Sequence, residues 1–164
     1  MNATSNGRGL RNSIAFLRIL IGWHFLYEGI VKVYNPDWTS FGYLASAQGP
    51  LTPVFQSMTS EAVLPWVDTL NWAALIFVGI TLISGVFERA GALVGFGLLM
   101  LYYLAHPSWP GMEQVNTEGS YWIVNKNLIE AVACLALFYQ PTGTLFGLPR
   151  LFSKKNPTAK TEMS

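Results

Sequence analysis

The sequence is short of charge. Only 12% of its 164 residues are Asp, Glu, Lys or Arg, whereas 51% are hydrophobic, and an average soluble domain has roughly 25% charged residues. A soluble domain of this length needs more charged side chains than that to coat its surface. The deficit indicates that part of the surface faces a medium other than water.

Cysteine and recognisable cofactor motifs are also scarce. The one cysteine, Cys134, excludes an internal disulfide, a CxxC redox pair and a thiolate metal cluster. There is no Gly-rich dinucleotide motif and no CxxCH haem attachment motif. A net charge of +1 argues against a nucleic-acid binder, which carries a basic surplus on one face. Any electrons that this protein handles should therefore come from a partner protein.

Four long apolar runs are present, at about 13–33, 66–86, 90–106 and 122–139. Each is near the roughly 17 to 25 residues that span a hydrocarbon core as a helix. The second and third runs are joined by a few residues around Glu88 and Arg89, so these helices should be antiparallel neighbours. The sequence predicts an all-α fold, a four-helix transmembrane bundle over residues 13–140, with tails at 1–12 and 141–164.

The basic residues outside the runs indicate the orientation. They flank only one end of the predicted bundle: Arg8, Arg11, Arg89, Arg150, Lys154, Lys155 and Lys160. The stretches 33–66 and 107–121 hold no Lys or Arg and only the acidic Asp37, Glu61, Glu113 and Glu118. The positive-inside rule places both termini in the cytoplasm and both longer stretches outside a bacterial inner membrane. The long extracytoplasmic loop 35–65, with its aromatic residues, Gly and Pro, is expected to form short interfacial helices that cap the bundle.

Two further patterns concern packing. Gly91 and Gly95, with Gly97 nearby, form a small-xxx-small pattern that favours close helix contact, either within the bundle or in a homodimer. Several aromatic residues lie near the predicted outer helix ends and are typical of an interfacial belt: Trp66, Tyr102, Tyr103, Trp109, Tyr121 and Trp122.

Polar residues interrupt the apolar runs and are expected to form one layer across the predicted bundle. In the first run Arg18, His24, Glu28 and Lys32 fall within an arc of roughly 120° at about 100° per residue. In the fourth run Lys126 and Glu130 are four residues apart on one face, beside Asn125 and Asn127. With these two helices antiparallel, both lysines lie near the outer interface and both glutamates one turn deeper, and His106 lies at the level of the lysines.

Such residues are costly in a bilayer, at about 2.5 to 3.5 kcal/mol for a charge at the helix centre. They should therefore face inward and pair. Two structural readings remain beside a functional one: Arg18 or Lys32 snorkels to an interface, and Glu28–Lys32 and Glu130–Lys126 are ion pairs that set helix register. The concentration in one layer on three helices favours a site for proton transfer.

Among redox ligands a quinone fits this layer best. His24 and His106 differ in depth by roughly 10 Å or more at 1.5 Å per residue, which disfavours a bis-histidine haem, and two nearby lysines oppose a metal cation. Quinone reduction takes up two protons, so an apolar pocket with donors and titratable groups suits it. We assign proton chemistry to Glu28, Glu130 and His106, with Lys32, Lys126, His24, Asn125 and Arg18 as binding residues.

Three segments carry a resemblance to a known family. They are RILIGWHFLYEGIVKVYNPDW at 18–38, YYLAHP at 102–107 and EGSYWIVNKNLIEA at 118–131, with the patterns R-x5-H-x3-E-x3-K and NKN-x2-E. Together they resemble the DoxX family, most closely its DoxD-like branch, the membrane subunit of thiosulfate:quinone oxidoreductases. The resemblance spans about 13–139 and implies a four-helix membrane fold and a quinone-linked redox role with a soluble or peripheral partner.

These patterns are compatible with three functions. The first is an integral subunit of a quinone-reducing complex that works with a periplasmic or peripheral redox partner. The second is a non-catalytic membrane anchor or assembly factor that docks a periplasmic enzyme through 35–65 and 107–121. The third is a small anion carrier that uses Lys32 and Lys126.

Overall fold

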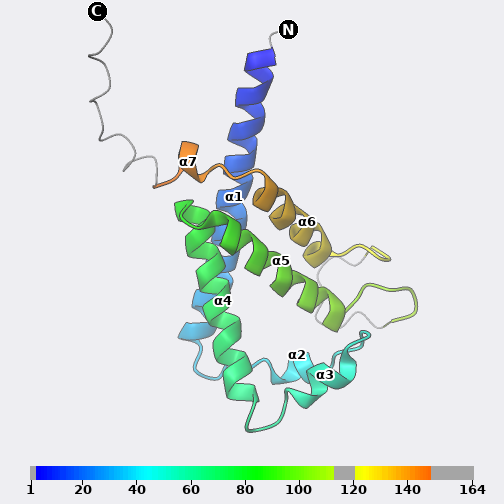
Figure 1. The fold of residues 1–164 in the computed structure, drawn as a ribbon. Helices are drawn as coiled ribbons and strands as arrows, with labels where there is room; N and C mark the ends of the chain where they lie inside the picture. The colour runs from blue at the N-terminus through cyan, green and yellow to red at the C-terminus, as the bar shows by residue number, and fades with distance from the viewer. Residues whose placement is uncertain (1–2, 113–120, 149–164) are drawn as a thin grey trace, which may run out of the picture.

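The computed structural model describes residues 3–112 and 121–148, and within them it is all-α, as predicted (Figure 1). Its helices are α1 (Ala3–Tyr34), α2 (Phe41–Ala45), α3 (Thr52–Ser57), α4 (Leu64–Ser84), α5 (Glu88–Ala105), α6 (Lys126–Tyr139) and α7 (Gly143–Phe146). Some of the charged residues that support the predicted orientation lie outside the described residues. They are the basic Arg150, Lys154, Lys155 and Lys160 and the acidic Glu113 and Glu118.

Two helix boundaries differ from those expected. The first helix begins at Ala3 rather than near residue 13, because no proline interrupts the first 35 residues. The last long helix begins at Lys126 rather than near 122. Asn125 caps it by accepting a hydrogen bond from the Leu128 backbone N–H at 3.0 Å, and Trp122 has a φ of 61°, which does not continue a helix.

The four longer helices pack as a chain of antiparallel neighbours. α1 lies against α4, α4 against α5 and α5 against α6, while α1 and α6 touch more lightly (Figure 1). The turn between α4 and α5 is tight because Gly85 ends α4 in the left-handed region, at a φ of 72°. Buried apolar residues from all four helices form one core, including Phe25, Val78, Leu99 and Cys134.

Glycines set the spacing of these helices. A Cβ added at Gly22 of α1 would lie 2.9 Å from Ile83 Cγ1 and 3.0 Å from the Ile83 backbone nitrogen, so only glycine allows this approach of α1 to α4. A Cβ at Gly91 would collide with the Thr81 side chain of α4, and one at Gly95 would lie 3.2 Å from Val78 Cγ1 of α4 and 3.3 Å from Cys134 Sγ of α6. The small-xxx-small pair thus packs α5 onto α4 within one chain.

A buried ion pair joins the middle of α1 to the start of α5 and to α7. Arg18 of α1 is fully buried and its Nη1 lies 2.9 Å from Glu88 Oε2 at the start of α5. The other oxygen of Glu88 accepts a hydrogen bond from the Gly143 backbone N–H of α7 at 2.7 Å, and Arg18 Nη2 donates to the Phe146 carbonyl at 3.3 Å. These contacts hold α7 against α1 and the α4–α5 turn.

The opposite end carries a cap, by which we mean residues 41–57 with α2 and α3. Leu44, Ala47 and Phe55 of the cap form a second apolar cluster with Ala105 at the end of α5. The Ala105 carbonyl also accepts hydrogen bonds from the backbone N–H groups of Gln48 and Gly49, at 2.9 and 3.1 Å. The cap is therefore packed against the end of α5 and the first turn of α4.

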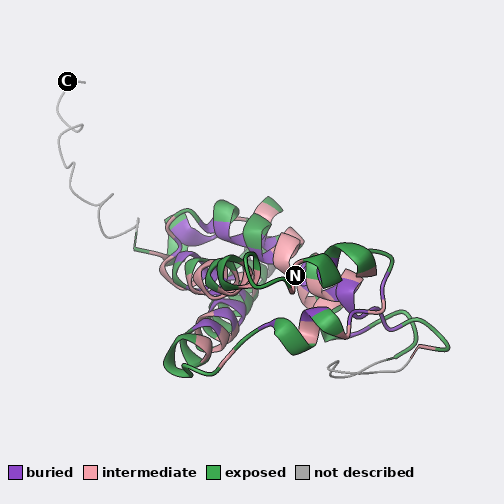
Figure 2. Cartoon of the chain, turned by 90° about the horizontal axis from the view of Figure 1, so that it is seen from below, coloured by how far each residue is buried: buried purple, intermediate pink, exposed green. Residues whose placement is uncertain are grey.

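Two helices are long and apolar enough to cross a membrane, α1 over Gly7–Tyr34 and α4 over Leu64–Ser84. Only 33% and 28% of their apolar windows are buried inside the protein, whereas the core helix of a soluble protein is mostly buried. Figure 2 shows exposed residues along the outer sides of the helices, and large apolar side chains are among them: Phe16, Trp23, Tyr27, Leu70, Phe77, Ile80, Leu93, Leu101, Ile129 and Val132. Exposed apolar surface of this extent favours contact with lipid.

Candidate functional site

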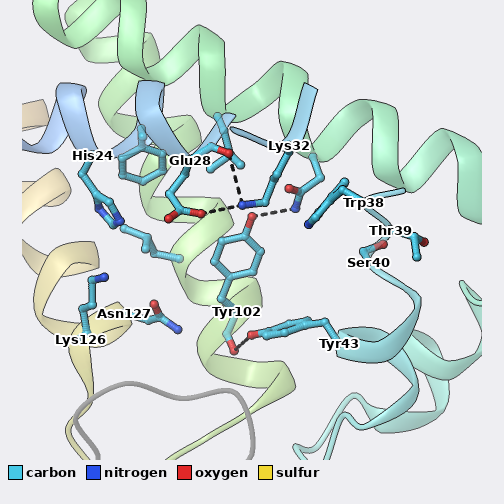
Figure 3. Close-up of a pocket in the computed structure, with 14 residues that line it drawn as sticks. His24, Glu28, Lys32, Trp38, Thr39, Ser40, Tyr43, Tyr102, Lys126 and Asn127 are labelled. Atoms are coloured by element: carbon cyan, nitrogen blue, oxygen red, sulfur yellow. Dashed lines mark hydrogen bonds and ion pairs between the residues drawn. The ribbon is translucent and has the colours of Figure 1, made fainter. Parts of the chain in front are cut away.

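A cavity of about 330 Å³ lies between α1, α4, α5, α6 and the cap (Figure 3). Its lining combines charged, amide and hydroxyl side chains with an apolar wall: His24, Phe25, Glu28, Lys32, Trp38, Thr39, Ser40, Tyr43, Asn71, Leu75, Leu99, Tyr102, Lys126 and Asn127. The cavity thus contains four of the residues predicted for the site, namely His24, Glu28, Lys32 and Lys126.

Glu28 and Lys32 form one of its two acid–base pairs. Lys32 Nζ lies 2.6 Å from Glu28 Oε2, one helical turn away. It also lies 5.4 Å from the centre of the Trp38 ring, at cation–π distance. The carboxylate and the aromatic face hold the ammonium group at the cavity wall, so Lys32 does not snorkel freely.

His24 and Glu130 form the second pair. His24 Nδ1 lies 2.6 Å from Glu130 Oε1 across the contact between α1 and α6. The sequence favours Lys126 as the partner of Glu130, four residues earlier on the same helix, but the hydrogen bond that the structure shows is to His24. Glu130 Oε2 is buried and has no hydrogen-bond partner among the described residues. Glu130 itself is not part of the cavity lining.

Among the lining residues that the sequence did not mark as site residues, three are joined by hydrogen bonds: Asn71, Tyr102 and Tyr43. Asn71 Nδ2 donates to the Tyr102 hydroxyl at 2.7 Å, and the Tyr43 hydroxyl donates to the Tyr102 carbonyl at 3.0 Å. Tyr102 belongs to this cavity, although its position near a helix end is typical of an interfacial belt. Asn71 is the one amide in the apolar run 66–86, and an isolated amide in such a run is a usable signal of an inward-facing polar group.

Tyr43 connects the cavity to the cap. Its ring packs against His106 with centroids 4.3 Å apart, and burial, together with the neighbouring Tyr102, raises the pKa of its hydroxyl group. Ser40, just before the cap, donates its backbone N–H to Asp68 of α4 at 2.9 Å. The cap is therefore fixed to α4 and α5 beside the cavity.

Three predicted site residues lie elsewhere. Arg18 pairs with Glu88 at the α4–α5 turn and is fully buried, so it neither snorkels nor reaches the cavity. His106 Nε2 lies 2.9 Å from the Tyr43 carbonyl oxygen, which holds His106 against the cap. Asn125 is buried as the N-cap of α6, where its side chain serves the helix terminus.

Within residues 3–112 and 121–148, no group of three or more His, Cys, Asp or Glu side chains is placed to hold a metal ion. No family model, curated protein or solved structure matches the chain.

Proposed function

We propose that the protein is an integral membrane subunit of a quinone-linked oxidoreductase, and that the cavity binds the quinone ring. The observation that supports this most directly is the composition of the cavity wall. Phe25, Leu75 and Leu99 offer an apolar surface for a flat ring, while two acid–base pairs lie beside it. A volume of about 330 Å³ lies within the roughly 300 to 1,000 Å³ of small-molecule sites.

The chemistry of quinone reduction matches these groups. Reduction of a quinone to a quinol consumes two electrons and two protons, so each ring oxygen needs a donor and a route for one proton. Lys32 and Lys126 would donate to the oxygens, and Glu28 and the His24–Glu130 pair would supply protons. The electrons would come from a redox centre on a periplasmic or peripheral partner protein.

The membrane topology belongs to the same proposal. We take α1, α4, α5 and α6 as the spanning helices, in lipid, with both termini on the cytoplasmic side of a bacterial inner membrane. Arg8, Arg11 and Arg89 support this orientation through the positive-inside rule. α6 has 14 residues and rises about 21 Å at 1.5 Å per residue, so the residues next to its ends would complete the crossing. The resemblance to the DoxX family supports both the bundle and the redox role.

The first experiment measures binding of a short-chain ubiquinone analogue to the full-length protein in lipid nanodiscs. Quenching of tryptophan fluorescence is the readout, because Trp38 lines the cavity, and a Trp38→Phe variant controls for the reporter. Leu99→Phe fills the cavity and should weaken binding about tenfold, the effect of roughly 1.4 kcal/mol. Leu101→Phe, two residues along α5 at an exposed position, is the matched control and should bind like the wild type.

Absence of saturable quenching in the wild-type protein, or equal binding by Leu99→Phe and wild type, would overturn the proposal. Melting temperatures of both variants show whether a loss of binding comes from misfolding. Mass spectrometry of material extracted in mild detergent adds an independent readout. A co-purifying quinone that is lost in Lys126→Ala supports the redox site. A co-purifying enzyme without any quinone would instead indicate the membrane anchor or assembly factor.

A further inference from the structure

We infer that the proton-exchanging atom of the cavity is Nε2 of His24, and that Glu130 is a positioning residue that acts through this imidazole. The inference deepens the proposed function, since it names which atom would exchange protons with a bound quinone. It also separates two carboxylates that the sequence places in equivalent roles. Glu28 lies on the cavity wall, whereas Glu130 stands behind His24.

Exposure distinguishes the two members of the pair. The His24 side chain keeps 34% of its surface accessible and lines the cavity, while the Glu130 side chain is only 12% exposed. A ligand in the cavity therefore meets the imidazole and not the carboxyl group. Glu130 can influence such a ligand only through the hydrogen bond that it makes to the ring.

The hydrogen bond determines which ring nitrogen is available. The inference takes Glu130 Oε1 as the acceptor of the 2.6 Å bond, which assigns the hydrogen to Nδ1 of His24. No hydrogen bond to Nε2 is present among the described residues. Nε2 is then the nitrogen that can take up or release a proton, and the negative charge of Glu130 stabilises the imidazolium that results.

Other charges face the same ring. Glu28 follows His24 by one turn on α1 and Lys126 precedes Glu130 by one turn on α6, and both line the cavity. Neither is hydrogen-bonded to His24 in the structure. They contribute to the field at the ring, but the orientation of the ring depends on Glu130.

His106 provides an internal comparison. Its Nε2 lies 2.9 Å from the Tyr43 carbonyl oxygen, and because a carbonyl oxygen can only accept, His106 carries its hydrogen on Nε2. The two histidines of this chain should therefore be opposite tautomers: His24 with the hydrogen on Nδ1 and His106 with it on Nε2.

The test is nitrogen NMR on the full-length protein in nanodiscs, labelled with ¹⁵N only in histidine. Two histidines give at most four ring nitrogen signals per state, and His106→Gln assigns them. At neutral pH we expect Nδ1–H for His24 and Nε2–H for His106, and on acidification the new proton should appear on Nε2 of His24. Glu130→Leu should abolish the tautomer preference of His24, whereas the control Glu28→Gln, a change at the neighbouring carboxyl group, should preserve it.

A neutral His24 that carries its hydrogen on Nε2, or an unchanged His24 spectrum in Glu130→Leu, would overturn the inference. The His106 signals show whether the Glu130→Leu variant keeps the cap folded. If it does not, Glu130→Gln replaces it, and the refutation is then an Nδ1 signal of His24 identical to that of the wild type. No quinone is present in this measurement, so its failure is distinct from a failure of quinone binding.

Discussion

Replacement of Arg18 by methionine should destabilise the protein strongly without touching the cavity. Arg18 makes a charge-assisted hydrogen bond of 2.9 Å to Glu88 and a second bond of 3.3 Å to the Phe146 carbonyl. Hydrogen bonds to charged groups contribute about 1.5 to 3 kcal/mol each, and removal of one partner from a buried ion pair costs about 3 to 5 kcal/mol. Glu88, only 8% exposed, would keep a single hydrogen bond, from the Gly143 N–H. We expect the free energy of unfolding to fall by about 3 to 5 kcal/mol, a value that includes both lost hydrogen bonds and the unpaired Glu88 carboxylate.

The assay is thermal unfolding in nanodiscs, where this loss corresponds to a decrease of roughly 6 to 20 °C in the melting temperature. Glu88→Gln in the Arg18→Met background removes the stranded charge, so the double variant should be more stable than the sum of the single effects by about 0.5 to 3 kcal/mol. Arg89→Gln changes the exposed neighbour and should stay within about 0.5 kcal/mol of the wild type. If Arg18→Met lowered the free energy of unfolding by less than about 1 kcal/mol, the reasoning would be refuted, because removal of one partner from a buried ion pair costs more than that.

Three further outcomes are expected. Gly29→Ala places a Cβ 2.7 Å from Ile76 Cγ1 and 3.0 Å from the Ile76 backbone nitrogen, so it should lower stability by about 1 to 3 kcal/mol; thermal unfolding checks this. Gly97→Ala, where a Cβ meets nothing within 4 Å, should instead raise stability by up to about 1 kcal/mol through helix propensity, and equal effects of the two changes would contradict the packing argument. Burial raises the pKa of Tyr43 in the folded protein, so the contribution of the neutral Tyr43 hydroxyl to the free energy of unfolding is complete below the unfolded phenol pKa of about 10 and declines at higher pH. Hydrogen exchange of the backbone amides of residues 41–57 should therefore become faster above that pH than exchange chemistry alone predicts. In Tyr43→Phe this additional pH dependence should be smaller.

The helical framework could be predicted because its signals are local. Long apolar runs, a short connection around Glu88 and a pair of spaced glycines each act within one or two helices. The helix boundaries were harder to predict, because the N-cap at Asn125 lies inside an apolar segment that extends back to Trp122. An asparagine three residues before the capped N–H is a readable signal that the hydropathy of the run outweighed.

The partners of the polar residues were harder to predict than their presence. Spacing alone pairs Glu130 with Lys126, but the hydrogen bond in the structure joins Glu130 to His24, 106 residues earlier in the chain. Arg18 shares an arc of α1 with His24, Glu28 and Lys32, yet its partner is Glu88, which the sequence places in a turn. Helix periodicity gives the face of a residue, whereas its partner depends on the packing of another helix against that face.

The His24–Glu130 contact also constrains how the protein can be made. At about 5 to 20 residues per second, the ribosome needs roughly 5 to 20 s to add the 106 residues that separate the two partners. During that interval α1 already carries an imidazole and two charged side chains of the cavity, and α6 does not yet exist. In the proposed membrane topology α1 would insert with Glu28 and Lys32 already able to pair on their own helix, whereas His24 would wait for Glu130, and the cavity can be completed only after α6 has left the ribosome.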